Sequence, residues 1–169
     1  MRKVLILDTS ILCVWLRVPG KETCGPDHAR WTYELVKEKI DSEIEAGTTL
    51  ILPLASIIET GNHIAQSHGD RHEIVNSFVE HIENTLDGKS PWTAFTEQSG
   101  IIENESFKQI LLTWKDTALT GQSLGDALIV AVARYYDKYN VQVEIFTGDE
   151  GLKAFEPVKP AAYIPRRRR

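Results

Sequence analysis

Residues 4–8 read Val-Leu-Ile-Leu-Asp, an unbroken apolar run that ends in a carboxylate. Aliphatic and β-branched residues without polar alternation are typical of a strand that is covered on both faces, so residues 3–8 predict a buried strand of a parallel sheet. Apolar runs at 49–52 and 141–147 predict two further strands. Because these strands alternate with helical segments, the sequence predicts an α/β fold built on a doubly wound, mostly parallel sheet.

Apolar residues at helical spacing, together with caps and breakers, predict the helices between these strands. One of them begins with Asp70 as its N-cap and with Glu73 as the second member of a capping box. Residues 88–100 are predicted as a loop, and residues 161–164 as a candidate edge strand. The predicted helices cover residues 9–17, 28–46, 53–66, 70–86, 103–115, 124–139 and 150–155.

Length and composition predict one globular domain. The chain has 169 residues, of which 42% are hydrophobic and 25% charged, and these proportions suit a domain with its own core. We expect a single domain over residues 1–165, with a long helical stretch at about 67–120, followed by a basic tail at 166–169. No apolar stretch is long enough to span a bilayer, and no signal-peptide cleavage site precedes the first strand, so a cytoplasmic protein is expected.

The net charge of −5 is unevenly distributed along the chain. The last four residues are all arginine, and without them 15 basic residues face 24 acidic ones, which gives the body a charge of −9. The body therefore lacks the uniformly basic surface that grips nucleic acid. The tail has three open interpretations: an arm that contacts RNA, a contact for a protein partner, or a solvated and disordered end.

The cysteines and histidines do not favour a soft-metal site. Cys13 lies in an apolar helical stretch and no Cys-x-x-Cys motif is present, so free thiols are expected rather than a disulfide or a structural zinc site. His63, His68 and His72 cluster around Glu59 in the sequence. His68 and His72 have the spacing of a zinc-binding helix, but the Gly-Asp pair between them breaks that helix.

Four carboxylates stand where strands end or helices begin, and they are the candidate functional residues. In an open parallel sheet these points face one crevice, which is where ligands bind. Carboxylates that converge there repel each other unless a cation holds them, and oxygen ligands suit a hard divalent cation. The sequence therefore predicts a metal-dependent enzyme. The four residues are Asp8 after the first strand, Glu59 on the helix after the second, Asp126 at the start of an apolar helix, and Asp149 after the third strand.

Each carboxylate also has a purely structural interpretation. Asp8 and Asp149 both stand where an aspartate caps a following helix. Asp126 follows Ser123 at capping-box spacing, although the apolar character of its helix predicts an enclosed position that favours a functional role. Periodicity alone favours a solvated Glu59, because this side chain projects away from the apolar face of its helix.

Missing motifs disfavour several enzyme classes. No glycine-rich fingerprint follows the first strand, and no P-loop motif is present, so dinucleotide-binding and P-loop folds are disfavoured. The Asp-Thr-Ser at residues 8–10 lacks the second aspartate that haloacid-dehalogenase-like phosphatases use. A Gly-x-Ser-x-Gly elbow for acyl transfer is also absent.

Taken in order along the chain, these motifs resemble those of the PIN domain family, the nuclease fold of VapC-type toxins and related ribonucleases. The resemblance spans nearly the whole chain, and the four motifs occur in the family's order on matching elements. The motifs are VLILDTS at residues 4–10, LP at 52–53 leading to IE at 58–59, SLGDALIVA at 123–131, and FTGDEGL at 146–152.

The resemblance implies a three-layer α/β/α sandwich whose acidic cluster binds Mg²⁺ or Mn²⁺. Ser10 and Thr147 would orient the cluster. The long helical stretch and the acidic body depart from the family pattern, and they leave substrate and partner open. The implied metal ligands, direct or through water, are Asp8, Asp126 and Asp149, with Glu59 completing the cluster as the member with least local support.

The resemblance also implies a function. The chain is expected to be a metal-dependent endoribonuclease, as the toxin of a toxin–antitoxin pair or otherwise, with RNA as substrate, an antitoxin protein as candidate partner and a homodimer as the expected assembly. Two alternatives remain open. One is a PIN-like protein-binding module with weak or lost catalysis, and the other is a structure-specific DNA nuclease with the same carboxylate chemistry.

Overall fold

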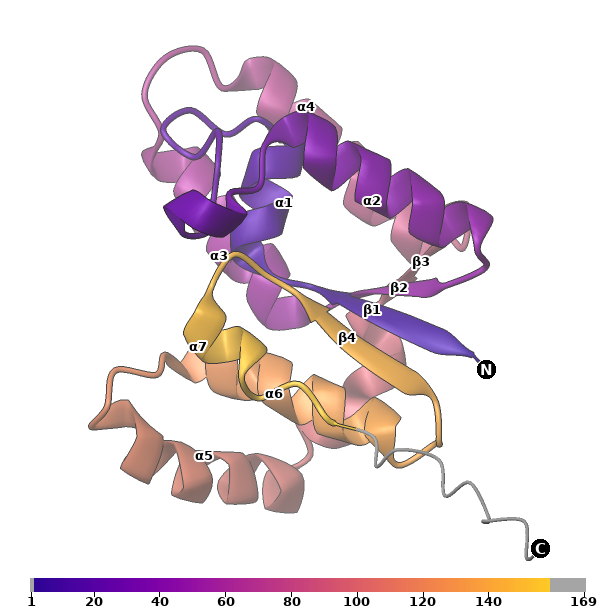
Figure 1. The fold of residues 1–169 in the computed structure, drawn as a ribbon, viewed down its shortest axis with the longest axis vertical. Helices are drawn as coiled ribbons and strands as arrows, with labels where there is room; N and C mark the ends of the chain where they lie inside the picture. The colour runs from indigo at the N-terminus through magenta and orange to yellow at the C-terminus, as the bar shows by residue number, and fades with distance from the viewer. Residues whose placement is uncertain (1, 159–169) are drawn as a thin grey trace, which may run out of the picture.

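Four parallel strands form one sheet in the computed structural model, which describes residues 2–158 (Figure 1). The strands are β1 (Lys3–Leu7), β2 (Thr49–Leu52), β3 (Trp92–Ala94) and β4 (Gln142–Phe146). Their spatial order is β3-β2-β1-β4, so β1 is a central strand with a parallel partner on each side. The pairing sets Ile6 beside Ile51 of β2 and beside Ile145 of β4.

Seven α-helices and two 3₁₀ helices accompany the sheet within residues 2–158. The 3₁₀ helices cover Asp27–Ala29 and Phe95–Ile101. The α-helices are α1 (Thr9–Trp15), α2 (Tyr33–Glu45), α3 (Leu54–Gln66), α4 (His72–Leu86), α5 (Asn104–Ala118), α6 (Leu124–Asp137) and α7 (Glu150–Lys153).

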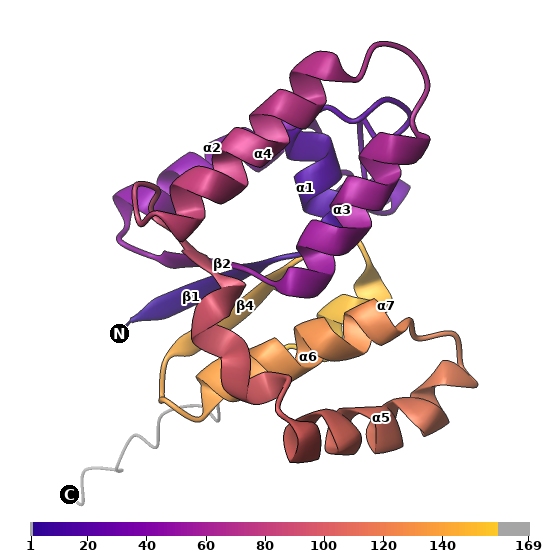
Figure 2. The same cartoon turned by 180° about the vertical axis from the view of Figure 1, so that it is seen from behind.

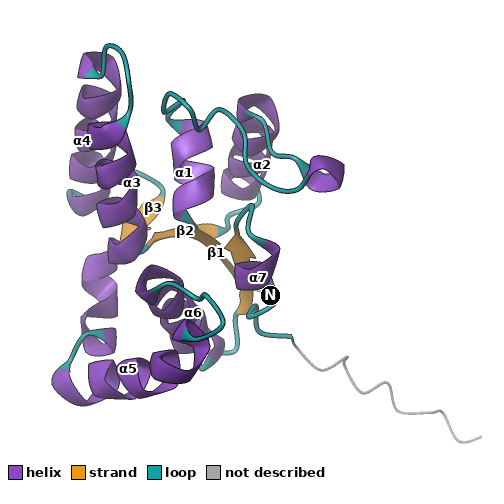
Figure 3. Cartoon of the chain, turned by 90° about the vertical axis from the view of Figure 1, so that its left-hand side faces the viewer, coloured by secondary structure: helices purple, strands orange, loops and turns teal. Residues whose placement is uncertain are grey.

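Helices cover both faces of the sheet (Figure 3). Helices α1 and α2 lie on one face and α6 on the other, with α5 on the outer side of α6 (Figures 1 and 2). Alternate side chains of β1 enter different core clusters: Leu5 and Leu7 pack with α1 and α2, whereas Val4 and Ile6 pack with α6. The predicted α/β/α sandwich with a parallel sheet is therefore confirmed.

The helix predicted for residues 28–46 begins later, at Tyr33. Thr32 is its N-cap, and Trp31 lies outside it. Trp31 instead pairs with Cys24 in an isolated antiparallel bridge, with N···O distances of 3.1 and 2.8 Å. Trp31 fits the helical spacing in the sequence, but its backbone hydrogen bonds are made to a distant segment, which periodicity does not reveal.

The predicted loop at 88–100 contains two elements, strand β3 and the 3₁₀ helix Phe95–Ile101. In β3, Trp92 pairs beside Leu50 and Ala94 beside Leu52 of β2. Three residues are too few to establish a strand pattern, so the prediction of a loop there is wrong for a simple physical reason: tertiary pairing, not local sequence, makes β3 a strand.

The capping box predicted at the start of α4 is also wrong. The N-cap of α4 is Arg71, and its side chain makes no capping hydrogen bond. Asp70 stands one residue earlier and accepts a hydrogen bond from the backbone N–H of His72 (2.9 Å). Glu73 consequently occupies the second helical position rather than the third, where a capping box would require it.

Two predictions concern residues beyond the described range. The candidate edge strand at 161–164 and the basic tail at 166–169 lie outside residues 2–158. Within the described range, no helix combines the length and the apolar character needed to cross a membrane.

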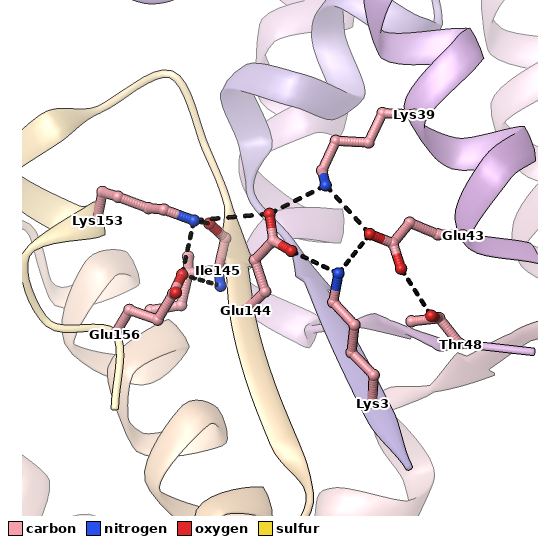
Figure 4. A network of polar contacts seen from close by, with 8 residues as sticks. All are labelled: Lys3, Lys39, Glu43, Thr48, Glu144, Ile145, Lys153 and Glu156. Carbon is pink, nitrogen blue, oxygen red and sulfur yellow. Dashed lines mark hydrogen bonds and ion pairs between the residues drawn. The ribbon is translucent and has the colours of Figure 1, made fainter. Parts of the chain in front are cut away.

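An ion-pair network joins β1, α2 and β4 near the start of β1 (Figure 4). Lys3 pairs with Glu43 of α2 and, at 2.7 Å, with Glu144 of β4. Lys39 bridges the same two carboxylates at 3.1 Å each, and Lys153 of α7 approaches Glu144 at 3.7 Å. The fold therefore supplies a cation for each carboxylate in this region.

The pKa of Glu43 shows the strength of this compensation. Burial alone would raise that pKa, but hydrogen bonds from Lys3, Thr48 and Lys39 more than offset the burial and lower it to about 2. The pKa of Glu144 is lowered in the same way, against its burial, by Lys3 and Lys39. Both carboxylates stay ionised in the folded protein because the lysines are held beside them.

Replacing Glu43 should expose this contribution. Glu43→Gln is expected to lower the free energy of unfolding by about 2 kcal/mol at pH 7, a value reduced from the full pKa shift for solvent screening. Because the pKa of Glu43 is lower in the folded than in the unfolded protein, its ionised carboxylate stabilises the fold above about pH 4.5. This stabilisation is lost as pH falls toward the folded pKa of about 2. The difference between wild type and variant should therefore shrink by more than half by pH 3.

Urea unfolding at pH 7, 4 and 3 measures this difference. Asp41→Asn is the matched control, because Asp41 forms an exposed pair with Lys37 on the same helix and should change stability by less than about 0.5 kcal/mol. A Glu43→Gln effect that is equally large at pH 7 and pH 3 would contradict the assignment of the network as the source.

Candidate metal centre

The four predicted carboxylates line one cavity of about 290 Å³. They reach it from four separate places: Asp8 directly follows β1, Asp149 follows β4 by three residues, Glu59 comes from α3, and Asp126 comes from the first turn of α6. This cavity lies where the carboxyl ends of β1 and β4 meet, as expected for a parallel sheet. The structure thus brings together all four residues singled out in the sequence.

Asp8 is held rigidly at the centre of a hydrogen-bond cluster. Its side chain is buried, and Oδ2 accepts hydrogen bonds from Ser10 N (3.2 Å), Ser10 Oγ (2.6 Å) and Thr147 Oγ1 (2.8 Å). No residue within 2–158 donates a hydrogen bond to the other carboxylate oxygen, Asp8 Oδ1. One oxygen is therefore anchored by the protein, while the other remains available to a ligand.

Ser10 and Thr147 each link Asp8 to the segment after β4. The backbone N–H of Gly148 donates to Ser10 Oγ (3.0 Å), and that of Asp149 donates to Thr147 Oγ1 (2.9 Å). The two hydroxyl groups therefore fix the end of β4 relative to Asp8.

Asp149 has the structural role that its position suggested. Its Oδ1 accepts hydrogen bonds from the backbone N–H groups of Gly151 (2.7 Å) and Leu152 (3.2 Å), so Asp149 is the N-cap of α7. The same side chain lines the carboxylate cavity. The capping bonds use only Oδ1, so capping and ligand binding are compatible in this residue.

Asp126 closes a capping box with Ser123. Ser123 N donates to Asp126 Oδ2 (3.2 Å), and Asp126 N donates to Ser123 Oγ (2.9 Å). The pKa of Asp126 is raised by burial, and the charges of Asp8 and Asp149 raise it further, against the hydrogen bonds from Ser123. The raised pKa shows that the hydrogen bonds from Ser123 do not fully compensate the negative charge of Asp126 in this position.

Glu59 is half-buried in this cavity, which corrects the solvated position that periodicity favoured. Its Oε2 accepts a hydrogen bond from Thr9 Oγ1 (3.0 Å). Burial raises its pKa and the charges of Asp126 and Asp8 add to this, while Thr9 and His63 act in the opposite direction. Periodicity failed here because the polar face of α3 looks toward α1 and α6 rather than toward water.

Gly125 makes room for Glu59, and sequence reasoning did not single it out. A Cβ atom at position 125 would lie 1.9 Å from Glu59 Oε1, so only a glycine permits this approach. Glycine is otherwise unfavourable inside a helix. A glycine in the first turn of α6 was therefore the available signal of a close contact, but its partner could not be identified from sequence.

The remaining cavity-lining residues were not assigned to the site in advance. Lys21 is the only lysine or arginine among the described residues that line the cavity, and its side chain is exposed. Both cysteines are free thiols, and burial raises the pKa of Cys13 to about 11. His68 and His72 do not line the cavity. The additional lining residues are Thr9, Cys13, Lys21, Thr23, Cys24 and His63.

The donor set fits a hard cation that retains water ligands. Among residues 2–158, no three His, Cys, Asp or Glu side chains stand in an arrangement that could hold a metal ion by themselves. Mg²⁺ usually keeps several waters and contacts only one or two carboxylates directly. Four carboxylates around one cavity, two of them with raised pKa values, match such a partly hydrated ion because it would relieve their repulsion.

No protein-family model, curated protein or solved structure matches the chain. The fold and the cavity show an α/β protein with an all-parallel sheet and with carboxylates gathered at the carboxyl end of that sheet.

Gly125→Ala should test whether the position of Glu59 matters for metal binding. The added methyl group displaces the flexible end of Glu59, so we expect stability within about 1 kcal/mol of wild type and Mn²⁺ affinity reduced about fivefold or more. Calorimetric titration with Mn²⁺ and urea unfolding measure the two quantities. Gly61→Ala is the matched control, since its added Cβ would meet only the Phe78 side chain at 3.6 Å. Equal Mn²⁺ affinity in both variants would contradict the role of Glu59.

Glu59→Gln should stabilise the metal-free protein. Because the folded pKa of Glu59 lies above its ordinary value, the ionised side chain destabilises the fold at neutral pH, and this cost disappears as pH falls through the folded pKa. In EDTA the variant should gain up to about 1 kcal/mol at pH 8 and nothing at pH 4. Urea unfolding measures the gain, with exposed Glu80→Gln as control. A loss of stability at pH 8 would show that Glu59 is already compensated.

Proposed function

We propose that this protein is a metal-dependent endoribonuclease of the PIN type, which hydrolyses RNA phosphodiester bonds with Mg²⁺ or Mn²⁺. The observation that carries the proposal is the convergence of four carboxylates from four separate elements on one cavity. The order of the motifs along the chain and the parallel sheet support the same assignment.

The chain's own residues have distinct roles in this proposal. Asp8, Asp126 and Asp149 would hold the ion, directly or through water, with Glu59 completing the set. Ser10 and Thr147 keep Asp8 Oδ2 occupied, so that Oδ1 is presented in one orientation. When bound, the ion supplies a water of lowered pKa and offsets negative charge on the phosphate oxygens.

Electrostatics make the proposed activity strictly dependent on metal. Four carboxylates in one cavity repel a phosphate group, and Lys21 is the only lysine or arginine among the described lining residues. The body of the chain is acidic as well, so general attraction of RNA is weak. Without a divalent cation, the cavity therefore disfavours its proposed substrate.

Two substitutions test the proposal. Asp8→Asn and Asp126→Asn keep side-chain size and should retain the fold, but each should reduce Mn²⁺-dependent cleavage of single-stranded RNA by at least about 100-fold. Asp116→Asn is the matched control, because Asp116 is an exposed carboxylate of α5 outside the cavity. Gel-resolved cleavage of a labelled RNA, with circular dichroism for the fold, provides the measurement.

Three outcomes decide between the candidates. Undiminished cleavage by purified Asp8→Asn and Asp126→Asn would contradict the nuclease mechanism. Cleavage of a matched DNA and not of RNA would favour a structure-specific DNA nuclease. No Mn²⁺ binding at millimolar concentration would favour the alternative of a protein-binding module.

The protein-binding alternative has structural support of its own. Large apolar side chains are exposed on two helices away from the cavity: Val75 and Val79 on α4, and Leu112 on α5 with Leu119 at its C-cap. Exposed apolar patches are typical of surfaces that bind another protein. A homodimer and an antitoxin partner are both compatible with these patches, and the toxin role and the cytoplasmic location stay predictions.

A further inference from the structure

A second cavity, of about 380 Å³, lies between α5 and α6 and shares no residue with the carboxylate cavity. Figure 3 shows α5 on the far side of α6 from the sheet, so this cavity belongs to the outermost layer of the protein. Its size is within the range of cavities that bind small molecules, about 300–1,000 Å³.

Incomplete packing of α5 leaves this cavity open. The apolar stripe predicted for α5 consists of Phe107, Ile110, Leu111 and Trp114, and all four are only partly buried. No residue of α5 is fully buried. The helix therefore contacts α6 without closing the space between them.

The walls of the cavity are mostly apolar. Ile101 and Val130 are buried and form part of its floor, and Trp114 and Phe155 contribute aromatic rings. The indole N–H of Trp114 already donates to Gln122 O (2.9 Å), so this ring offers the cavity an apolar surface. Such walls suit the hydrocarbon part of a ligand rather than a phosphate chain.

Two cations stand together at the rim. Arg134, in the last turn of α6, and Lys138, the C-cap of that helix, both line the cavity. They are four residues apart and the backbone of Lys138 is still helical, which places them on the same side of the helix. Neither makes a hydrogen bond or an ion pair with any residue within 2–158. By contrast, Lys3, Lys39 and most other described lysines are paired with carboxylates.

We propose that this cavity binds an amphipathic organic acid, a small molecule with an apolar or aromatic body and one carboxylate. The body would occupy the space between Trp114 and Val130, and the carboxylate would be held by Arg134 and Lys138. Guanidinium–carboxylate contacts are charge-assisted and can be bidentate, so the rim selects for charge while the walls select for apolar shape. The carboxylate cavity, by contrast, is lined by four acidic side chains.

The probe for this proposal is 2-naphthoate, an aromatic carboxylate small enough for the cavity, with 2-naphthamide as its uncharged analogue. Titrations of the full chain are followed by the fluorescence of the four tryptophans and by calorimetry. We expect saturable binding of 2-naphthoate with a Kd below about 1 mM, and binding of 2-naphthamide at least about fivefold weaker.

Substitutions locate the binding. Arg134→Met and Lys138→Met should each weaken 2-naphthoate binding about fivefold or more, whereas Lys115→Met should leave it unchanged. Lys115 is the matched control because it is an exposed cation of α5 that does not line the cavity. Circular dichroism checks that each variant is folded.

The results that overturn the proposal are equally definite. No saturable binding at 2-naphthoate concentrations of about ten times the expected Kd would do so, as would equal affinity for 2-naphthamide. Unchanged affinity in folded Arg134→Met and Lys138→Met would do so as well. Because the measurement is of binding alone, it is independent of whether the chain cleaves RNA.

Discussion

Parallel pairing of β1 with both β2 and β4 determines where the charged residues of this protein come together. All three strands run in the same direction, so the chain leaves each of them at the same edge of the sheet. Thr147 and Asp8, which are 139 positions apart in sequence, are thereby brought to a hydrogen-bond distance of 2.8 Å. Helices α1 and α7 begin at this edge, and the partial positive charge of their N-termini reduces the cost of placing carboxylates there.

The fold treats its buried acidic residues in two opposite ways. Near the start of β1, Glu43 and Glu144 each have lysines within ion-pair distance, and their pKa values are lowered. At the opposite end of the same strand, Glu59 and Asp126 have raised pKa values because burial and neighbouring carboxylates dominate. In the carboxylate cavity the described basic lining residues are Lys21 and His63, and no ion pair with Glu59 or Asp126 forms among the described residues. This difference between the two ends of β1 supports the proposal that a cation from outside the chain binds in the cavity.

The sequence could predict those elements whose own residues form a pattern, but not those that depend on contacts with distant segments. After their first residues, β1 and β2 are continuous apolar runs, and they were recognised because burial on both faces leaves that pattern. Strand β4 was recognised from its apolar residues Val143, Ile145 and Phe146, although Glu144 interrupts them. The short strand β3 exists through pairing with β2, so its three residues carried no pattern of their own. In the same way, Trp31 satisfied helical spacing while its backbone bonds to Cys24.

The residues of the candidate site show the same difference between local patterns and distant contacts. Asp8 and Asp149 could be found from their positions after strands, whereas Glu59 was misplaced by the periodicity of a single helix. That periodicity assumes that the side opposite the core faces water, and α3 breaks the assumption because α1 and α6 cover its polar side. Lys21 had no local signal, since only the folded chain brings it to the cavity.

Asp126 shows why a structural role and a functional role need not compete. The capping box uses Asp126 Oδ2 and the backbone N–H, which fixes the first turn of α6 and leaves Oδ1 without a partner among the described residues. The next residue, Ala127, lines the cavity between α5 and α6. The first turn of α6 is therefore a wall of both cavities, and its capping box sets the geometry of each. Capping the helix and lining the carboxylate cavity are therefore compatible roles for Asp126.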